Sequence, residues 1–330
     1  MSGERFLPAP GVAGFHRQTL FAALLRFQHL RGDPAQECRW LQVDEHTRVA
    51  LHMSWARSGA APTLLLVHGM CGSARSNYML GTTRLALRAG LHVARLDLRG
   101  ARTREAQTEW LGHAGQIEDL AVAVDALQDE GRVSALTLAG FSMGGNIVLR
   151  LGSHWGARAP SKLRSLVAVS AAADLHACQS ALDGEPGLRV YRDSFLRRLK
   201  RFVRVHAKLH GERPWTAEAL VADSLLAYDA AGVCPVYDFS DPLDYYTRAS
   251  ALHELDALRV PTLALHALDD RMVPCGPSLV AAAARNPALT VELAQRGGHC
   301  AFVGRTARKA SPTHFWAEAR VVEHALASGL

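Results

Sequence analysis

The feature that most constrains this chain is a serine between glycines, placed where a predicted strand meets a predicted helix. Residues 140–145 read GFSMGG, directly after an apolar run that ends at Ala139 and directly before a helical run over 146–151. A serine at such a turn takes a strained backbone, which the glycines leave room for, and its Oγ is exposed at the helix N-terminus. There the helix dipole and the N–H of Met143 can stabilise an oxyanion. Because a chance match would lack this strand-to-helix context, we predict that Ser142 is a nucleophile.

Apolar runs that alternate with helical segments predict the architecture around this turn. Six runs have the continuous hydrophobicity of strands buried on both faces, as in a parallel sheet; they are residues 63–67, 91–96, 135–139, 166–169, 262–265 and 290–294. Before them, residues 39–43 and 48–55 flank a turn at 44–47 and indicate a hairpin. With 330 residues and 48% hydrophobic content, we expect a single α/β domain, a mostly parallel sheet flanked by helices. A serine turn at a strand end of such a sheet is typical of the α/β-hydrolase fold.

The alternation stops between Asp174 and about Leu258. This stretch is helical in period and basic, and glycine and proline interrupt it at 184–187, 214, 235 and 242. We predict a helical lid inserted between two strands of the sheet. Its most periodic part has an apolar stripe flanked by arginines and lysines; the stripe comprises Phe195, Leu199, Phe202, Val203 and Leu209. We favour a solvated basic face above a packed stripe, with weak peripheral contact with an anionic membrane as the alternative.

A second glycine-containing turn follows the strand that ends at Val67. Residues 68–73 read HGMCGS, and the backbone N–H of Met70 is the expected second oxyanion donor beside that of Met143. We interpret His68 as a structural histidine that braces this loop, because it stands at the strand end with a glycine after it. Cys71 is expected to be a small apolar filler near the pocket.

An acid and a base are expected in the chain order Ser, Asp or Glu, His. Asp270 lies in the loop after strand 261–267, four residues before a proline, and is the favoured acid. Its neighbour Asp269 is expected to cap the loop or balance charge, and Asp174 is the runner-up for the acid. His299 follows two glycines directly after the last apolar run, so its loop can carry the imidazole over the nucleophile. Its position selects it among sixteen histidines.

Other classes of function find less support in the sequence. The six cysteines sit singly, without a CxxC pair or a His/Cys cluster, so we predict no metal, cofactor or redox motif. No signal-like or membrane-spanning run is present, and a cytoplasmic protein is expected. The net charge of +6 has no nucleic-acid-binding module beside it, so we expect no nucleic-acid partner. His92 and Asp97 match an acyltransferase pattern, but a strand would pull them apart.

With these residues in place, the chain resembles the YheT-like branch of the α/β-hydrolase superfamily, which includes the abhydrolase-domain lipases. The resemblance covers most of the chain and rests on segments 15–20, 68–69, 72–73, 78, 98–100, 140–146, 191–192, 195–196, 244–246 and 297–299. It places the family triad on Ser142, Asp270 and His299. The chain departs from the family at 70–71 and 235–239, both beside the expected pocket.

The resemblance and the residues together imply a serine hydrolase that cleaves carboxylic esters, with a small-molecule ester or a lipid as substrate. Acyl transfer to Ser142 and hydrolysis of the acyl-enzyme would need no cofactor. A thioesterase or an acyltransferase on the same fold is the alternative, since the acyltransferase differs only in what intercepts the acyl-enzyme. A non-catalytic binding protein is a third reading, against which the intact Ser, Asp and His argue.

Overall fold

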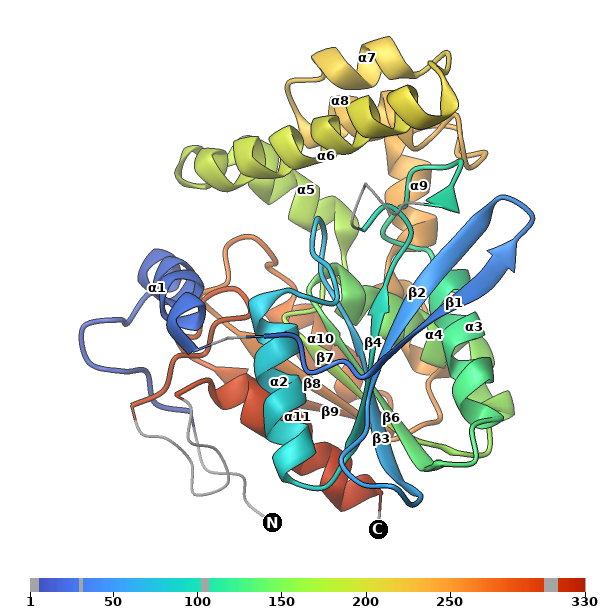
Figure 1. Cartoon of the computed structure of the whole chain (residues 1–330). Coiled ribbons are helices and arrows are strands. Elements are labelled where there is room, and N and C mark those ends of the chain that lie inside the picture. The colour runs from blue at the N-terminus through green and yellow to red at the C-terminus, as the bar shows by residue number, and fades with distance from the viewer. Residues whose placement is uncertain (1–5, 30–31, 102–106, 306–313, 330) are drawn as a thin grey trace.

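A mostly parallel sheet forms the centre of the computed structural model, which describes residues 6–29, 32–101, 107–305 and 314–329 (Figure 1). Nine strands belong to it within these ranges: β1 Glu37–Asp44, β2 Thr47–Ser54, β3 Ala61–Val67, β4 His92–Asp97, β5 Gln107–Thr108, β6 Val133–Phe141, β7 Leu163–Val169, β8 Thr262–Ala267 and β9 Leu289–Ala294. Their order is β1-β2-β4-β3-β6-β7-β8-β9, with the short β5 paired to β2. The pairs that involve β2 are antiparallel, and every other pair is parallel.

The predicted fold class is therefore confirmed, and every predicted strand lies within a strand of the structure or overlaps one. The predicted hairpin is β1 and β2, although their turn is shorter than the sequence suggested, because β1 extends to Asp44 and β2 begins at Thr47. Strand β5 was not predicted, because its two residues are too few for a hydrophobic period.

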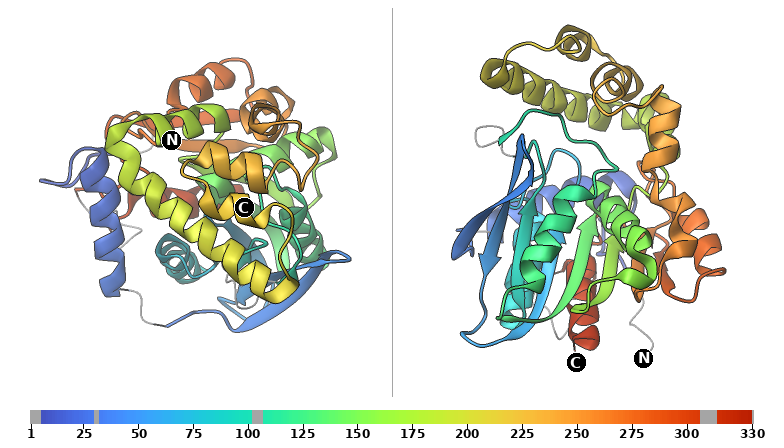
Figure 2. Two further views of the ribbon diagram at one scale, coloured as in Figure 1. Left: turned by 90° about the horizontal axis from the view of Figure 1, so that it is seen from above. Right: turned by 90° about the vertical axis from the view of Figure 1, so that its right-hand side faces the viewer.

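Helices cover both faces of the sheet. Helices α2 Asn77–Arg88 and α11 Trp316–Ser328 pack on one face, and α1 Phe15–His29 lies against α2. Helices α3 Glu118–Gln128 and α4 Met143–Trp155 pack on the other face, and α10 Gly276–Ala283 packs on β8 and β9. The right-hand view of Figure 2 shows these layers from the side, with the sheet between them.

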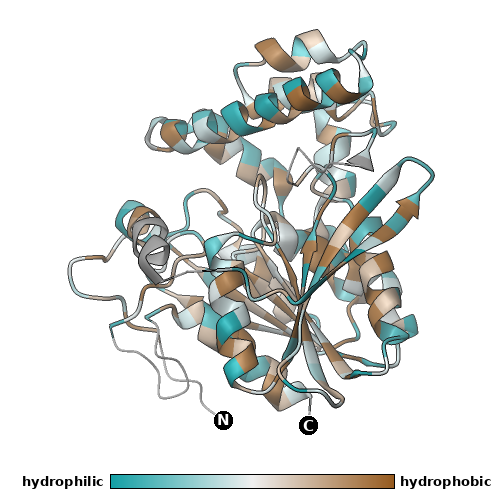
Figure 3. Cartoon of the chain, viewed as in Figure 1, coloured by the Kyte–Doolittle hydropathy of each residue, from teal (hydrophilic) through white to brown (hydrophobic). Residues whose placement is uncertain are grey.

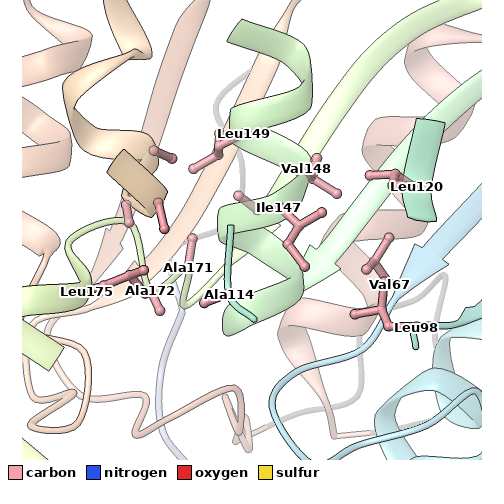
Figure 4. Packing of buried hydrophobic residues seen from close by; sticks show 14 of the residues in the cluster. Val67, Leu98, Ala114, Leu120, Ile147, Val148, Leu149, Ala171, Ala172 and Leu175 are labelled. Carbon is pink, nitrogen blue, oxygen red and sulfur yellow. The ribbon is translucent and has the colours of Figure 1, made fainter. Parts of the chain in front are cut away.

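The two larger hydrophobic clusters of the described residues lie on opposite faces of the sheet, because successive residues of a strand point to opposite faces. In β3, Leu64 and Leu66 pack with residues of α2 and α11, whereas Leu65 and Val67 join the cluster with α3 and α4. Figure 4 shows the second cluster, in which Val67 approaches side chains of α3 and α4. Full burial of each such side chain contributes about 1.5–3 kcal/mol, so the central strands are anchored on both faces. Their carboxyl ends are thereby held in place as a rigid edge.

The segment between β7 and β8 consists of helices, as predicted. It contains α5 Leu175–Gly184, α6 Arg189–His210, α7 Thr216–Val221, α8 Leu225–Gly232 and α9 Pro242–Ala249, with short 3₁₀ turns. We call this segment the helical insertion. It lies above the carboxyl ends of the parallel strands, at the top of Figure 1.

Helix α6 carries the predicted apolar stripe and the basic residues, and both kinds of residue alternate along it in Figure 3. Phe202 and Val203 are buried, and Phe195 and Leu199 pack against the core. Leu209 was wrongly included in the stripe: it lies in the last turn of α6 and is 54% exposed. The arginines at 197, 198, 201 and 204 are exposed, as a solvated face requires, and contact with an anionic membrane stays a prediction.

Within the described ranges, no helix combines the length and the apolar character needed to cross a membrane.

Candidate active site

Ser142 occupies the turn between β6 and α4, and its backbone has the strain that the sequence predicted. Its φ is 55°, in the left-handed region that non-glycine residues rarely adopt. The glycines around it are required by space: a Cβ on Gly140 would lie 2.1 Å from the carbonyl oxygen of Gly144. A Cβ on Gly144 would lie 2.5 Å from the carbonyl oxygen of His68. Close approach of three chain segments therefore fixes the serine at the helix N-terminus.

The structure brings Ser142, His299 and Asp270 into one hydrogen-bonded chain. The His299 Nε2 lies 2.9 Å from the Ser142 Oγ, and the His299 Nδ1 lies 2.8 Å from the Asp270 Oδ2. The three residues follow the carboxyl ends of β6, β9 and β8, which reach the same edge of the sheet. Because a carboxylate only accepts hydrogen bonds, Nδ1 is the donor to Asp270, and the neutral ring presents Nε2 as acceptor to the serine hydroxyl.

The three candidate aspartates have different partners. Asp270 has a fully buried side chain, holds His299, and also accepts from the N–H of Val273. The Asp269 Oδ1 accepts from the backbone N–H groups of Gly297 and Gly298, at 2.7 and 2.9 Å, and so fixes the loop before His299. Asp174 caps α5 through the N–H of Ala177. The contact to the imidazole therefore belongs to Asp270.

The charge of Asp270 sets the protonation of His299. Burial alone would lower the pKa of His299, but the negative charge of Asp270, its hydrogen bond to the ring and the neighbouring Cys300 together outweigh burial and raise that pKa well above 6.5. Asp270 therefore stabilises the imidazolium, the form that the ring takes when it accepts a proton.

Helix α1 supports the histidine loop, a contact that sequence reasoning missed. The backbone N–H of His299 donates to the Thr19 Oγ, and Gln18 exchanges two hydrogen bonds with the backbone of Val303. Both residues belong to the segment 15–20 that carried part of the family resemblance, which was the available signal. The N-terminal helix thus orients a loop at the other end of the chain.

The turn after β3 lies beside the serine. Met70 and Met143, the two expected oxyanion donors, line the same cavity as Ser142 and His299. His68 has the bracing role that the sequence predicted, because its Nδ1 donates to the Gly69 carbonyl and its Nε2 accepts from the Leu98 N–H. Burial raises the pKa of Cys71 to about 12. Its thiol is therefore protonated, in keeping with an apolar filler.

Two further polar side chains hold the turns around the nucleophile in place. The Tyr78 hydroxyl accepts from the N–H of Gly69 at 2.9 Å. Asn146, on the first turn of α4, donates to the carbonyls of Ala114 and Ala249 and accepts from the N–H of Ala251. Both positions belong to the segments that carry the family resemblance. Asn146 ties the nucleophile helix to the end of the helical insertion.

A cavity of about 120 Å³ opens over Ser142 and His299. The helical insertion supplies most of its wall, largely with apolar side chains that include Leu175, Leu182, Phe195, Leu199 and Leu225. A neighbouring cavity of about 490 Å³ shares Met70, Met143 and Leu199 with the first and is lined further by Arg198, Arg201 and Phe202. The smaller cavity contains the reactive groups, so we take it as the substrate site.

His92 and Asp97 are held apart, as predicted. Asp97 accepts a hydrogen bond from the His52 Nε2. At the opposite end of β4, the His92 Nδ1 accepts from the Ala56 N–H and the Nε2 donates to the Gly59 carbonyl.

Known proteins similar to this chain are hydrolases. The chain is 28% identical over 328 residues to YheT of Escherichia coli (strain K12), provisionally named an esterase, which covers 97% of this chain and 92% of that protein. It is 25% identical over 242 residues to phospholipase ABHD3 of Mus musculus, and this match covers 73% of the chain but only 58% of the relative. An esterase structure from Pyrococcus furiosus superposes with a TM-score of 0.59 at 16% identity, covering 99% and 100% of the two chains, which shows the shared fold.

The family model described as serine aminopeptidase, S33, matches residues 59–304. This range includes the nucleophile turn, the helical insertion and the loops of Asp270 and His299. It covers well over half of the sequence, so the chain belongs to the serine aminopeptidase S33 family of α/β-hydrolases.

Proposed function

We propose that this protein hydrolyses carboxylic esters through an acyl-enzyme formed on Ser142. The observation that carries the proposal is the hydrogen-bonded chain from Asp270 through His299 to Ser142, at the base of a largely apolar cavity. The same arrangement performs acyl transfer on several unrelated folds, which makes its geometry more informative than the fold.

Each group has a role in the proposed reaction. The His299 Nε2 takes the proton of the Ser142 hydroxyl as Oγ attacks the ester carbonyl, and Asp270 stabilises the resulting imidazolium. The N–H groups of Met70 and Met143 stabilise the oxyanion of the tetrahedral intermediate. His299 then gives the proton to the leaving alcohol, and water activated by the same ring hydrolyses the acyl-enzyme.

Small-molecule esters or lipids are the substrates that we propose. The apolar cavity wall suits an acyl chain, and relatives of this chain are named esterase, phospholipase and monoacylglycerol lipase. A panel of p-nitrophenyl esters of increasing acyl length, with a matched p-nitroanilide and thioester, tests the proposal. We expect turnover of the esters to exceed that of the anilide and the thioester. Turnover confined to the anilide or the thioester would contradict ester hydrolysis.

Acyltransfer is tested in the same reactions by adding a primary alcohol. We expect free acid to remain the main product, because in the proposed reaction water, and not the added alcohol, takes the acyl group from the acyl-enzyme. Transfer to the alcohol as the main outcome would assign the protein to the alternative activity.

The helical insertion is proposed to act as a lid that bounds the acyl chain. Phe195 and Leu199 of α6 line the cavity over the serine, whereas Phe202 lines the neighbouring cavity and packs against Gly100. We expect Phe195→Ala to lengthen the preferred acyl chain, while the rate on the shortest ester changes little, because only long chains reach the vacated space. The p-nitrophenyl panel measures this shift. Equal loss on every ester would contradict an acyl-binding role for Phe195.

The pH dependence of kcat/KM follows from the protonation of His299. The ring must be neutral to accept the serine proton, and Asp270 raises its pKa well above 6.5. We therefore expect kcat/KM to fall as the pH is lowered through an inflection above 6.5. In Asp270→Asn the stabilising charge is lost, so the inflection moves to lower pH. An inflection in that variant at the wild-type pH would show that another group controls the profile.

A further inference from the structure

A carboxyl group of the helical insertion faces the cavity that holds the serine and the histidine. It belongs to Asp229, the lone charged residue of the helix LLAYDAAG, which is α8. Asp229 lines the cavity together with Ser142 and His299, and the residue is half-buried. An acidic group at this place is unexpected in a wall made largely of apolar and aromatic side chains.

One oxygen of this carboxyl accepts a hydrogen bond from a neighbouring side chain. The Tyr246 hydroxyl on α9 donates to the Asp229 Oδ2 at 2.8 Å. An ionised carboxylate has about four lone-pair sites for hydrogen bonds, so the Tyr246 contact leaves accepting capacity beside the cavity. Burial raises the pKa of Asp229 to about 7; the Tyr246 bond opposes this effect and the charge of Asp183 adds to it.

The energetics favour a ligand at this position. A buried carboxylate is costly unless it is paired, because it loses the hydrogen bonds of water. Gln179 also lines the cavity and carries an amide donor, but its Nε2 donates to the Asp183 Oδ2 instead. A donor carried by the substrate would satisfy Asp229, while a plain alkyl chain would leave it in contact with carbon.

We propose that Asp229 is a specificity residue that accepts a hydrogen bond from a hydroxyl or ammonium group on the ester substrate. The proposal rests on the ester hydrolysis proposed above and narrows its substrate class to esters with a polar donor on an otherwise apolar body. The rival interpretation is structural: Asp229 would serve only to hold Tyr246 and join α8 to α9.

Matched substrates separate the two interpretations. Methyl butanoate, hexanoate and octanoate are compared with their ω-hydroxy and ω-ammonium derivatives at about pH 8, where the Asp229 carboxyl is ionised. The quantity measured is the ratio of kcat/KM between each donor-bearing ester and its plain counterpart. In the wild type we expect this ratio to reach about tenfold or more at one chain length, the value of a hydrogen bond to a charged group.

Variants then locate the effect. Asp229→Leu should bring the ratio down to about one. Asp229→Asn keeps an acceptor but loses the charge, so it should lower the ratio for the ammonium ester more than for the hydroxy ester. Tyr246→Phe is the matched control: it removes the same hydrogen bond but keeps the carboxyl, so the ratio should persist while the Tm falls.

Several results would overturn the proposal. The first is a wild-type ratio near one at all three lengths. The second is a ratio that neither Asp229 variant changes, and Asp229→Asn alone suffices here if Asp229→Leu does not fold. The third is an equal loss of the ratio in Tyr246→Phe, which would support the structural role. Failure of the proposed ester hydrolysis can be distinguished from failure of the Asp229 proposal, because the plain esters would then also remain uncleaved.

Discussion

Ser142→Ala is expected to lower kcat for ester hydrolysis by roughly 10⁴- to 10⁶-fold, as removal of a nucleophile does in comparable enzymes. The substitution removes only the Oγ that lies 2.9 Å from the His299 Nε2. The remaining cavity and oxyanion donors keep binding the substrate but have no group to acylate. Initial rates on the best p-nitrophenyl ester, measured with enough enzyme to detect the residual reaction, give the ratio.

The fold should survive this substitution. Alanine preserves the close glycine contacts of the turn and removes little packing, so the Tm of Ser142→Ala should match that of the wild type within a few degrees. Residual kcat within tenfold of the wild type, in a folded variant, would show that Ser142 is not the nucleophile.

Asp270→Asn should have the second largest effect, a loss of about 10⁴-fold in kcat. The amide can no longer stabilise the imidazolium, and it can hold the ring in the wrong tautomer. Asp269→Asn is the matched control one residue away. An asparagine there can still accept from the N–H groups of Gly297 and Gly298 through its amide oxygen, so we expect a loss of less than about tenfold.

The ranking of these two variants decides the acid. If Asp269→Asn is the more damaging, the acid is one residue earlier than proposed. If neither variant reduces kcat by tenfold, Asp174→Asn is the next variant to measure. A large loss of activity in that variant would assign the acid to Asp174 and contradict the role proposed for Asp270.

The nucleophile turn and the strands could be predicted because their signals are local. Buried parallel strands require continuous apolar runs, and the strained turn at Ser142 requires glycines at fixed spacing. Asp270 and His299 could be placed because parallel strands end at one edge of the sheet, so the loops after β8 and β9 converge near β6.

The contacts that the sequence did not predict join segments far apart in the chain. Thr19 reaches His299 across 280 positions, and Asn146 bonds Ala249 across 103. Such a contact depends on how the helices pack on the sheet, so no local periodicity in the sequence predicts it. For Asp229 the sequence contains a weak indication, a single acidic residue in an apolar helix. The position of its side chain beside the cavity follows only from the packing of α8.

Covalent labelling tests the central claim most directly. The protein is treated with a fluorophosphonate, digested, and mapped by peptide mass spectrometry. The account predicts one adduct, on the Oγ of Ser142, which is absent in Ser142→Ala and slower to form in His299→Ala, because the histidine activates the hydroxyl. An adduct on another residue, or a folded wild-type protein that hydrolyses esters without forming any adduct, would contradict it.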